Sequence, residues 1–65
     1  MGLTRKTLQK VDKSEKVKGM LADLYDKKVK SVNRWIEEND PILTTIDSLR
    51  IIESELGIPL KDAVE

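Results

Sequence analysis

Residues 27–34, with the sequence KKVKSVNR, carry the side chains of this chain that are best suited to recognise a polyanion. An arginine can donate two hydrogen bonds to guanine, and an asparagine can pair in the same way with adenine, so Arg34 and Asn33 are candidate base contacts. Lys30 can reach either a base or a phosphate. Lys27 and Lys28 stand at the start of a predicted helix, where the helix dipole favours a phosphate group. These residue types predict contacts to double-stranded DNA, although the three lysines are equally compatible with a solvated surface.

The same segment has an apolar stripe at helical spacing, and this stripe predicts how the cations are presented. Its members are Val29, Val32, Trp35 and Ile36. In a helix over residues 28–39, the stripe lies opposite Lys30, Arg34 and Glu37. We expect Trp35 to anchor this helix in the core by burying a large apolar area. Glu37 is expected to pair with Arg34 at a spacing of three residues.

A second predicted helix, over residues 14–25, comes directly before this one. The short turn between them is the connection found in a helix-turn-helix, whose second helix can enter the major groove of DNA. In such a unit, the first helix needs a small residue where the second packs across it, and Ala22 is such a residue. Val32 and Trp35 follow Ala22 by ten and thirteen positions, which is the spacing expected for the facing apolar residues.

Helical periodicity continues through the rest of the chain and predicts an all-α fold. We expect a compact four- to five-helix bundle that forms a single domain over residues 1–65, with helices at 4–11, 14–25, 28–39, 45–56 and 60–64. Thr4, Ser14, and either Thr44 or Thr45 are candidate helix N-caps, and Gly57 is a candidate helix terminator in the left-handed conformation. The apolar residues that the other helices are predicted to turn toward the core are Leu8, Val11, Val17, Leu21, Leu24, Ile46, Leu49, Ile52 and Leu56.

The composition excludes several classes of function. The chain has no cysteine and no histidine, so it lacks disulfides and the usual ligands of a zinc site. It has no glycine-rich phosphate loop and no carboxylate pair at a catalytic spacing, so we expect no enzyme activity, no cofactor and no small-molecule substrate. No apolar segment approaches the roughly 20 residues of a membrane span, and the N-terminal segment lacks the apolar core of a signal peptide. We therefore expect a cytoplasmic protein that does not bind membranes.

The charges are unevenly distributed along the chain, although they cancel in total. Residues 1–34 hold ten Lys or Arg residues and four acidic residues, whereas residues 35–65 hold two and eight. A basic half of this kind is typical of a protein that binds a polyanion, but scattered charge that only keeps the chain soluble is an alternative. The sequence leaves open whether residues 1–12 dock on the domain as a helix or extend from it as a mobile basic arm.

The segments LADLYDKKVKSVNRWIEEN and LTTIDSLRIIESELGIPLKDAV resemble the lambda-repressor-like (Cro-type) helix-turn-helix domains. The pattern of that family is Leu-Ala, a turn, then Val or Ile, a polar residue, Arg and Trp, with a later helix that ends in Leu-Gly-Val or Leu-Gly-Ile. The resemblance covers residues 17–64. The segment LTRKTLQKV, taken with RWIEEN, is also similar to small DNA-binding proteins of phages and mobile elements in Bacteroides-type bacteria.

This resemblance implies a transcription regulator that binds DNA through the second helix of the helix-turn-helix. It places the DNA contacts on Lys28, Lys30, Ser31, Asn33 and Arg34. Two positions depart from the family pattern, because Asp26 stands where Gly is usual and Lys27 stands where a buried Val is usual. Since Asp tolerates the left-handed conformation better than most residues do, we expect the turn to form.

A homodimer and a protein–protein interaction module are alternative interpretations of the acidic C-terminal half. Four apolar residues there exceed what one small core is expected to bury, namely Ile42, Leu43, Ile51 and Ile58. They are candidate contacts for a second copy of the chain or for another protein. RNA binding is disfavoured because Tyr25 and Trp35, the only aromatic residues, are both expected in the core. The DNA-binding prediction requires Lys30 and Arg34 on one exposed face, whereas the interaction module requires a contiguous apolar patch of more than a few hundred Å².

Overall fold

Hydroxyl side chains start three of the helices at predicted positions. In the computed structural model, which describes residues 2–65, the side-chain oxygens of Thr4, Ser14 and Thr45 each accept a hydrogen bond of 3.2 Å from a backbone N–H three residues later. A cap of this kind typically stabilises a helix by about 1 kcal/mol. The helices that follow these caps are α1 (Arg5–Lys13), α2 (Glu15–Leu24) and α4 (Ile46–Leu56).

The remaining helices are α3 (Val29–Glu38), the short α5 (Leu60–Ala63) and one turn of 3₁₀-helix, η1 (Pro41–Thr44). α3 ends at Asn39 and α4 ends at Gly57, both with positive φ angles of 49° and 69° in the left-handed region. The predicted all-α fold is confirmed, with each α-helix ending within two residues of its expected bounds. The sequence analysis missed η1, which begins where the Asp40 carboxylate accepts a hydrogen bond of 2.9 Å from the backbone N–H of Ile42.

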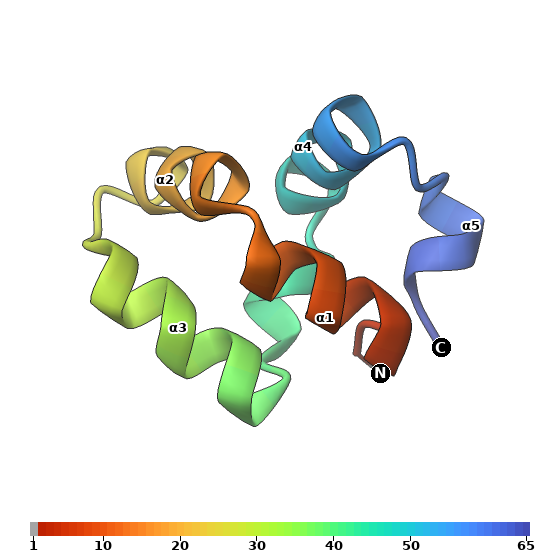
Figure 1. The fold of residues 1–65 in the computed structure, drawn as a ribbon, viewed down its shortest axis with the longest axis horizontal. Coiled ribbons are helices and arrows are strands. Elements are labelled where there is room, and N and C mark those ends of the chain that lie inside the picture. The colour runs from red at the N-terminus through yellow and green to blue at the C-terminus, as the bar shows by residue number, and fades with distance from the viewer. Residues whose placement is uncertain (1) are drawn as a thin grey trace.

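The helices pack around one core (Figure 1). α2 and α4 cover one side of it, α1 and α3 cover the other, and α5 packs against α4. Among residues 2–65, the buried apolar side chains are Leu3, Val11, Val17, Leu21, Ala22, Val32, Leu43, Leu49, Ile52 and Ala63. Every α-helix contributes to this set, so the core depends on the packing of all five α-helices that the structure describes.

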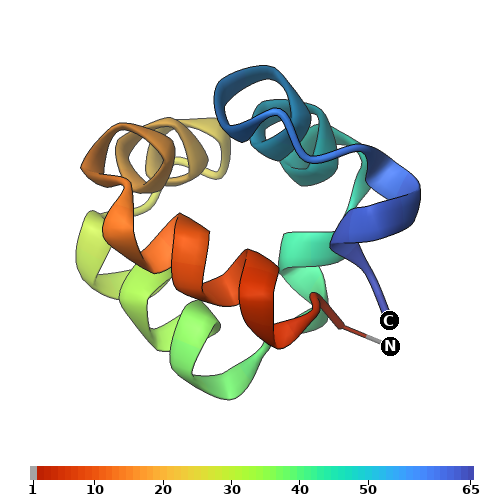
Figure 2. The same ribbon diagram turned by 45° about the vertical axis from the view of Figure 1, so that its right-hand side comes forward.

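The N-terminal segment is docked, which resolves the question left open by the sequence for residues 2–12. Leu3 forms an antiparallel bridge with Val64, and the backbone N–H of Thr4 donates to the carbonyl oxygen of Ala63 at 3.0 Å. The two chain ends therefore lie side by side (Figure 2). Leu3 is fully buried, and α1 packs against α2, α3 and α4.

Asn39 joins the N-terminal segment to the end of α3. Its side-chain oxygen accepts a hydrogen bond of 3.0 Å from the backbone N–H of Leu3, and its amide group donates one of 3.1 Å to the carbonyl oxygen of Leu3. Gly2 lies directly against this pair, because an added Cβ would approach Asn39 Nδ2 to 2.6 Å and Oδ1 to 2.7 Å. A side chain at position 2 is therefore incompatible with the observed position of the Asn39 amide.

Gly2→Ala is accordingly expected to lower the free energy of unfolding by about 1–3 kcal/mol, because the methyl group must displace a side chain held by two hydrogen bonds. Urea denaturation followed by circular dichroism measures this change. Gly19→Ala is the matched control, since nothing lies within 4 Å of a Cβ added in the interior of α2. There the same substitution is expected to raise stability by about 0.5–1 kcal/mol. A Gly2→Ala variant that is as stable as the wild type, or more stable, would contradict the account of Gly2.

Two predicted core residues are wrong. Leu24 and Ile46, at the last turn of α2 and the first turn of α4, are 39% and 58% exposed. Thr7, Lys18 and Ser48 are buried instead.

The four apolar residues predicted as contacts for a second copy all contribute to the core. Leu43 is fully buried, and Ile42, Ile51 and Ile58 are partly buried and pack against the core. The small core therefore accommodates more apolar residues than the sequence suggested.

Candidate nucleic-acid interface

The inner face of α3 fixes the orientation of the helix. Val32 is fully buried, and Val29, Trp35 and Ile36 pack against the core while remaining partly exposed. The expectation that Trp35 is a core residue therefore holds only in part. Its ring packs at the edge of the core against the ring of Tyr25, with centroids 5.6 Å apart and an interplanar angle of 87°. This edge-to-face contact joins α3 to the turn that precedes it.

The outer face of α3 is polar and exposed. Lys30, Asn33 and Arg34 are all exposed, and they line one shallow depression together with Glu37 and Glu38. The structure thus brings three of the six predicted site residues together on one face. The other three lie at its borders, with Ser31 half-buried along one edge and Lys27 and Lys28 exposed at the N-terminal end.

The predicted ion pair between Arg34 and Glu37 is wrong. The Arg34 Nε lies 3.4 Å from Glu38 Oε2, at a spacing of four residues. At this spacing, successive turns place the two side chains one above the other on the helix surface. Both side chains are more than half exposed, so the pair contributes little stability and Arg34 is free to exchange Glu38 for another acceptor.

A tight turn connects α2 to α3 and sets where the two lysines lie. Asp26 takes a φ angle of 53°, which confirms that an aspartate supplies the left-handed residue of this turn. The backbone N–H of Lys27 donates to the carbonyl oxygen of Ala22 at 2.8 Å, and Lys28 is the N-cap residue of α3. The Lys27 side chain is exposed, so it does not fill the corner as an apolar residue would.

The hydroxyl group of Tyr25 holds this corner together, and the sequence analysis did not identify that role. It donates to the carbonyl oxygen of Ile42 at 3.2 Å, lies 2.6 Å from Ser48 Oγ, and also contacts Thr45 Oγ1. These partners belong to η1 and the start of α4. The turn before α3 is therefore tied to a segment about 20 residues away in the chain.

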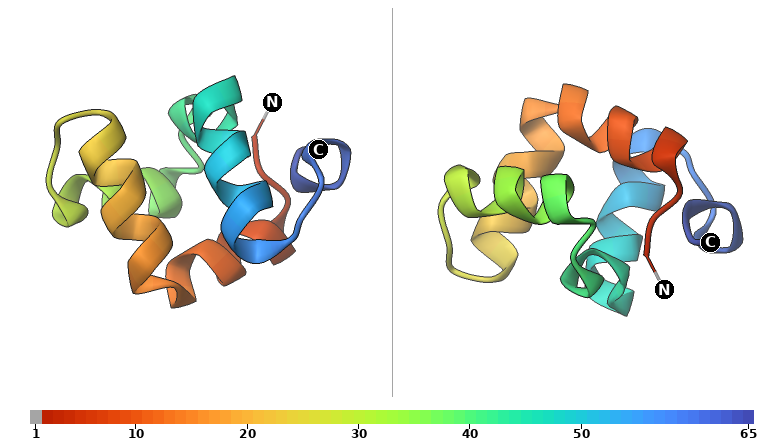
Figure 3. Two further views of the ribbon diagram at one scale, coloured as in Figure 1. Left: turned by 90° about the horizontal axis from the view of Figure 1, so that it is seen from above. Right: turned by 90° about the horizontal axis from the view of Figure 1, so that it is seen from below.

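α1 lies beside α3 in the view from below (Figure 3, right). The two helices are roughly antiparallel, since the bonds between Asn39 and Leu3 place the start of α1 at the end of α3. The start of α1 therefore borders the C-terminal end of α3.

Two further features, a membrane-spanning helix and a metal-binding group of side chains, are absent from the part of the chain that is described. Over residues 2–65, no helix is both long enough and apolar enough to cross a bilayer. The same residues place no group of three or more acidic side chains where they could hold a metal ion.

The candidate interface thus consists of the outer face of α3, bordered by the turn at its N-terminal end. Its defining side chains are Lys27, Lys28, Lys30, Asn33 and Arg34, with Ser31 at one edge. No family model, curated protein or solved structure matches the chain.

Proposed function

We propose that this protein is a sequence-specific DNA-binding protein that inserts α3 into the major groove and regulates transcription. One observation carries the proposal: α3 is held by the fully buried Val32 on its inner face while Lys30, Asn33 and Arg34 stand exposed on the outer face. A helix that reads DNA needs both a fixed orientation and donors that match base edges.

The dimensions and chemistry of α3 fit this role. The major groove is about 12 Å wide and admits an α-helix with its side chains. Arg34 would donate to guanine after exchanging its exposed partner Glu38, and Asn33 would pair with adenine. Lys27 and Lys28 would contact phosphates at the N-terminal end of the helix, where the dipole adds to their charge.

The alternative of a protein–protein interaction module has weaker support. Over residues 2–65, Leu24 and Ile46 are the exposed large apolar side chains, and two partly exposed residues fall short of the patch that such a module needs. In the preferred proposal the protein acts in the cytoplasm as a Cro-type regulator of a phage or mobile element, as the sequence resemblance implies. A homodimer on two half-sites is compatible with this proposal.

Fluorescence anisotropy of a labelled random-sequence duplex, titrated against salt, tests the proposal. The wild type is expected to bind at about 50 mM salt and to lose affinity steeply as salt rises, because bound cations release counterions from the duplex. Lys30→Ala/Arg34→Ala is expected to weaken binding about tenfold and to make the salt slope shallower by about 1–2.

The matched control removes the same charge from other helices. Arg50→Ala/Lys61→Ala changes two exposed cations on α4 and α5, so it is expected to retain the wild-type slope. If both double variants lose the same affinity for the duplex, the loss follows from the lower net charge alone. That result would contradict the role of α3. Absence of wild-type binding at about 50 mM salt, with the helical spectrum intact, would rule out DNA binding.

A further inference from the structure

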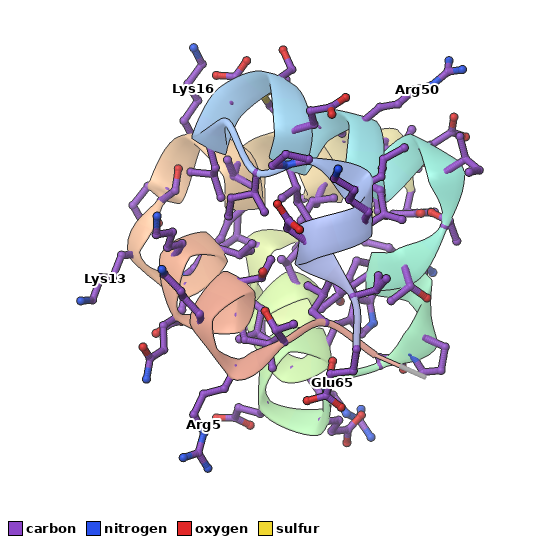
Figure 4. The ribbon with its side chains drawn as sticks, turned by 90° about the vertical axis from the view of Figure 1, so that its right-hand side faces the viewer. Arg5, Lys13, Lys16, Arg50 and Glu65 are labelled. Atoms are coloured by element: carbon purple, nitrogen blue, oxygen red, sulfur yellow. The ribbon has the colours of Figure 1, made fainter. Side chains whose placement is uncertain are left out.

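Arg5 stands at the start of α1, next to the C-terminal end of α3, whose last turn holds no basic residue. Asn39, which ends α3, binds both backbone groups of Leu3, and Arg5 begins α1 two residues further on. The start of α1 is therefore fixed at the C-terminal end of α3. Figure 4 shows Arg5 extending away from the start of α1 on the side of the molecule where α3 lies, whereas Lys16 and Arg50 extend from the opposite side.

Of the other charged groups of α1, Lys13 lies at the opposite end of the helix from Arg5, and the remaining three are directed elsewhere or are already paired. Lys6 and Lys10 line a small open cavity with the loop at residues 57–59, so they face α4 and α5. Asp12 lies 3.3 Å from the Lys18 ammonium group. Arg5 makes no ion pair with any residue in the range 2–65. Its charge is thus available to a partner that approaches α3.

The charge at position 5 is unfavourable for α1 itself. The positive end of a helix dipole favours acidic residues, yet the first turn of α1 holds no acidic residue and begins with Arg5. A charged residue that is unfavourable for its own helix dipole and has no ion-pair partner in the fold is typical of a functional position. No carboxylate in the range 2–65 pairs with Arg5, so its exposed charge is open to an external anion.

Cations lie beyond both ends of α3, which spans Val29–Glu38 or about 15 Å along its axis. Lys27 and Lys28 precede its first residue, and the start of α1 with Arg5 lies at its C-terminal end. Glu37, Glu38 and the carbonyl end of the helix dipole would repel a phosphate at the C-terminal end of α3. A backbone can approach that end only if a cation such as Arg5 offsets this repulsion.

We propose that Arg5 contacts a backbone phosphate of the DNA beside the C-terminal end of α3, while Lys27 and Lys28 contact phosphates at its N-terminal end. The start of α1 and the turn before α3 then hold the DNA backbone at both ends of the helix, while the outer face of α3 faces the bases. This inference rests on the proposed DNA-binding function. It adds a second element to the interface and names its ligand as a phosphodiester of duplex DNA.

The test compares the salt dependence of duplex binding in Arg5→Gln, Arg50→Gln and the wild type by fluorescence anisotropy. Loss of one phosphate contact makes the slope of log K against log salt shallower by about 0.9, so Arg5→Gln is expected to show that change. Between 50 and 200 mM salt, the ratio of the wild-type affinity to that of Arg5→Gln is therefore expected to fall by about 3.5-fold. Arg50→Gln removes an equal charge from the opposite side and is expected to keep the wild-type slope.

Arg5→Glu distinguishes a lost phosphate contact from a damaged fold. An acidic residue at the first position of α1 suits the helix dipole, so this variant is expected to melt at a higher temperature than the wild type. It is expected to bind duplex more weakly than Arg5→Gln. A lower melting temperature together with weaker binding would attribute the effect to folding and overturn the inference.

The two proposals fail in different ways. With a wild type that binds duplex, Arg5→Gln could keep the wild-type salt slope, or Arg50→Gln could change the slope as much as Arg5→Gln does. Either result overturns the role of Arg5 and leaves DNA binding through α3 standing. If the folded wild type does not bind duplex at about 50 mM salt, both proposals are overturned.

Discussion

Asn39→Ala is expected to lower the free energy of unfolding by about 3 kcal/mol, which is most of what a core of this size can supply. The substitution removes both partners of the Leu3 backbone, whose N–H and carbonyl groups form hydrogen bonds of 3.0 and 3.1 Å with the Asn39 side chain. Leu3 is fully buried, so these groups would lose their hydrogen bonds in a site with little access to water. Alanine is also less tolerant than asparagine of the φ angle of 49° at this position.

Urea denaturation followed by circular dichroism measures this loss, with two variants as references. Asn33→Ala makes the same chemical change on the exposed face of α3 and is expected to shift stability by less than about 0.5 kcal/mol. Asn39→Gly removes the same hydrogen bonds but accepts the left-handed conformation, so it isolates their contribution from that of the backbone. An Asn39→Ala midpoint equal to that of Asn33→Ala would mean that the bonds to Leu3 do not hold the N-terminal segment.

Local signals in the sequence were sufficient to predict where the helices begin and end. The hydroxyls of Thr4, Ser14 and Thr45 act on residues three positions away, and Gly57 terminates its helix through its own backbone angle. Such interactions depend only on neighbours in the chain, so residue type and spacing reveal them.

Contacts between distant parts of the chain were not predictable in this way. Asn39 and Leu3 are 36 residues apart, and Tyr25 and Ser48 are 23 apart. No pattern in one helix indicates which side chain of another it will meet. The same limit explains the errors at Leu24 and Ile46, because apolar spacing defines a face of a helix but does not say how far the neighbouring helix extends along it.

The sequence predicted which face of α3 is exposed, but it did not predict the contacts of the individual side chains there. The spacing of Val32 against Lys30 and Arg34 correctly predicted which face of α3 is exposed. The pairing of Arg34 with Glu38, and the position of Arg5 at the end of α3, depend on side-chain conformation and on the docking of α1. Neither can be read from the helical period alone.

Tyr25→Ala is expected to lower the free energy of unfolding by about 3 kcal/mol and to loosen α3 from the helix that precedes it. The ring packs edge-to-face against Trp35, and the hydroxyl binds η1 through the carbonyl oxygen of Ile42 and α4 through Ser48. Tyr25→Phe keeps the ring but leaves the buried Ser48 hydroxyl with one partner fewer, so it is expected to cost only about 1–2 kcal/mol. Urea denaturation of the two variants separates the ring from the hydroxyl.

The emission of Trp35 reports what happens to α3. As the only tryptophan, Trp35 is expected to shift its emission to longer wavelength in folded Tyr25→Ala, because the ring that covers its edge is gone, and to keep its wavelength in Tyr25→Phe. A double-mutant cycle of Tyr25→Phe with Ser48→Ala should give a coupling energy of about 1 kcal/mol if the hydroxyl pair joins the turn to α4. Additive effects would show that the two hydroxyls act independently. In that case the ring contact with Trp35 alone would orient the face of α3 that carries Lys30 and Arg34.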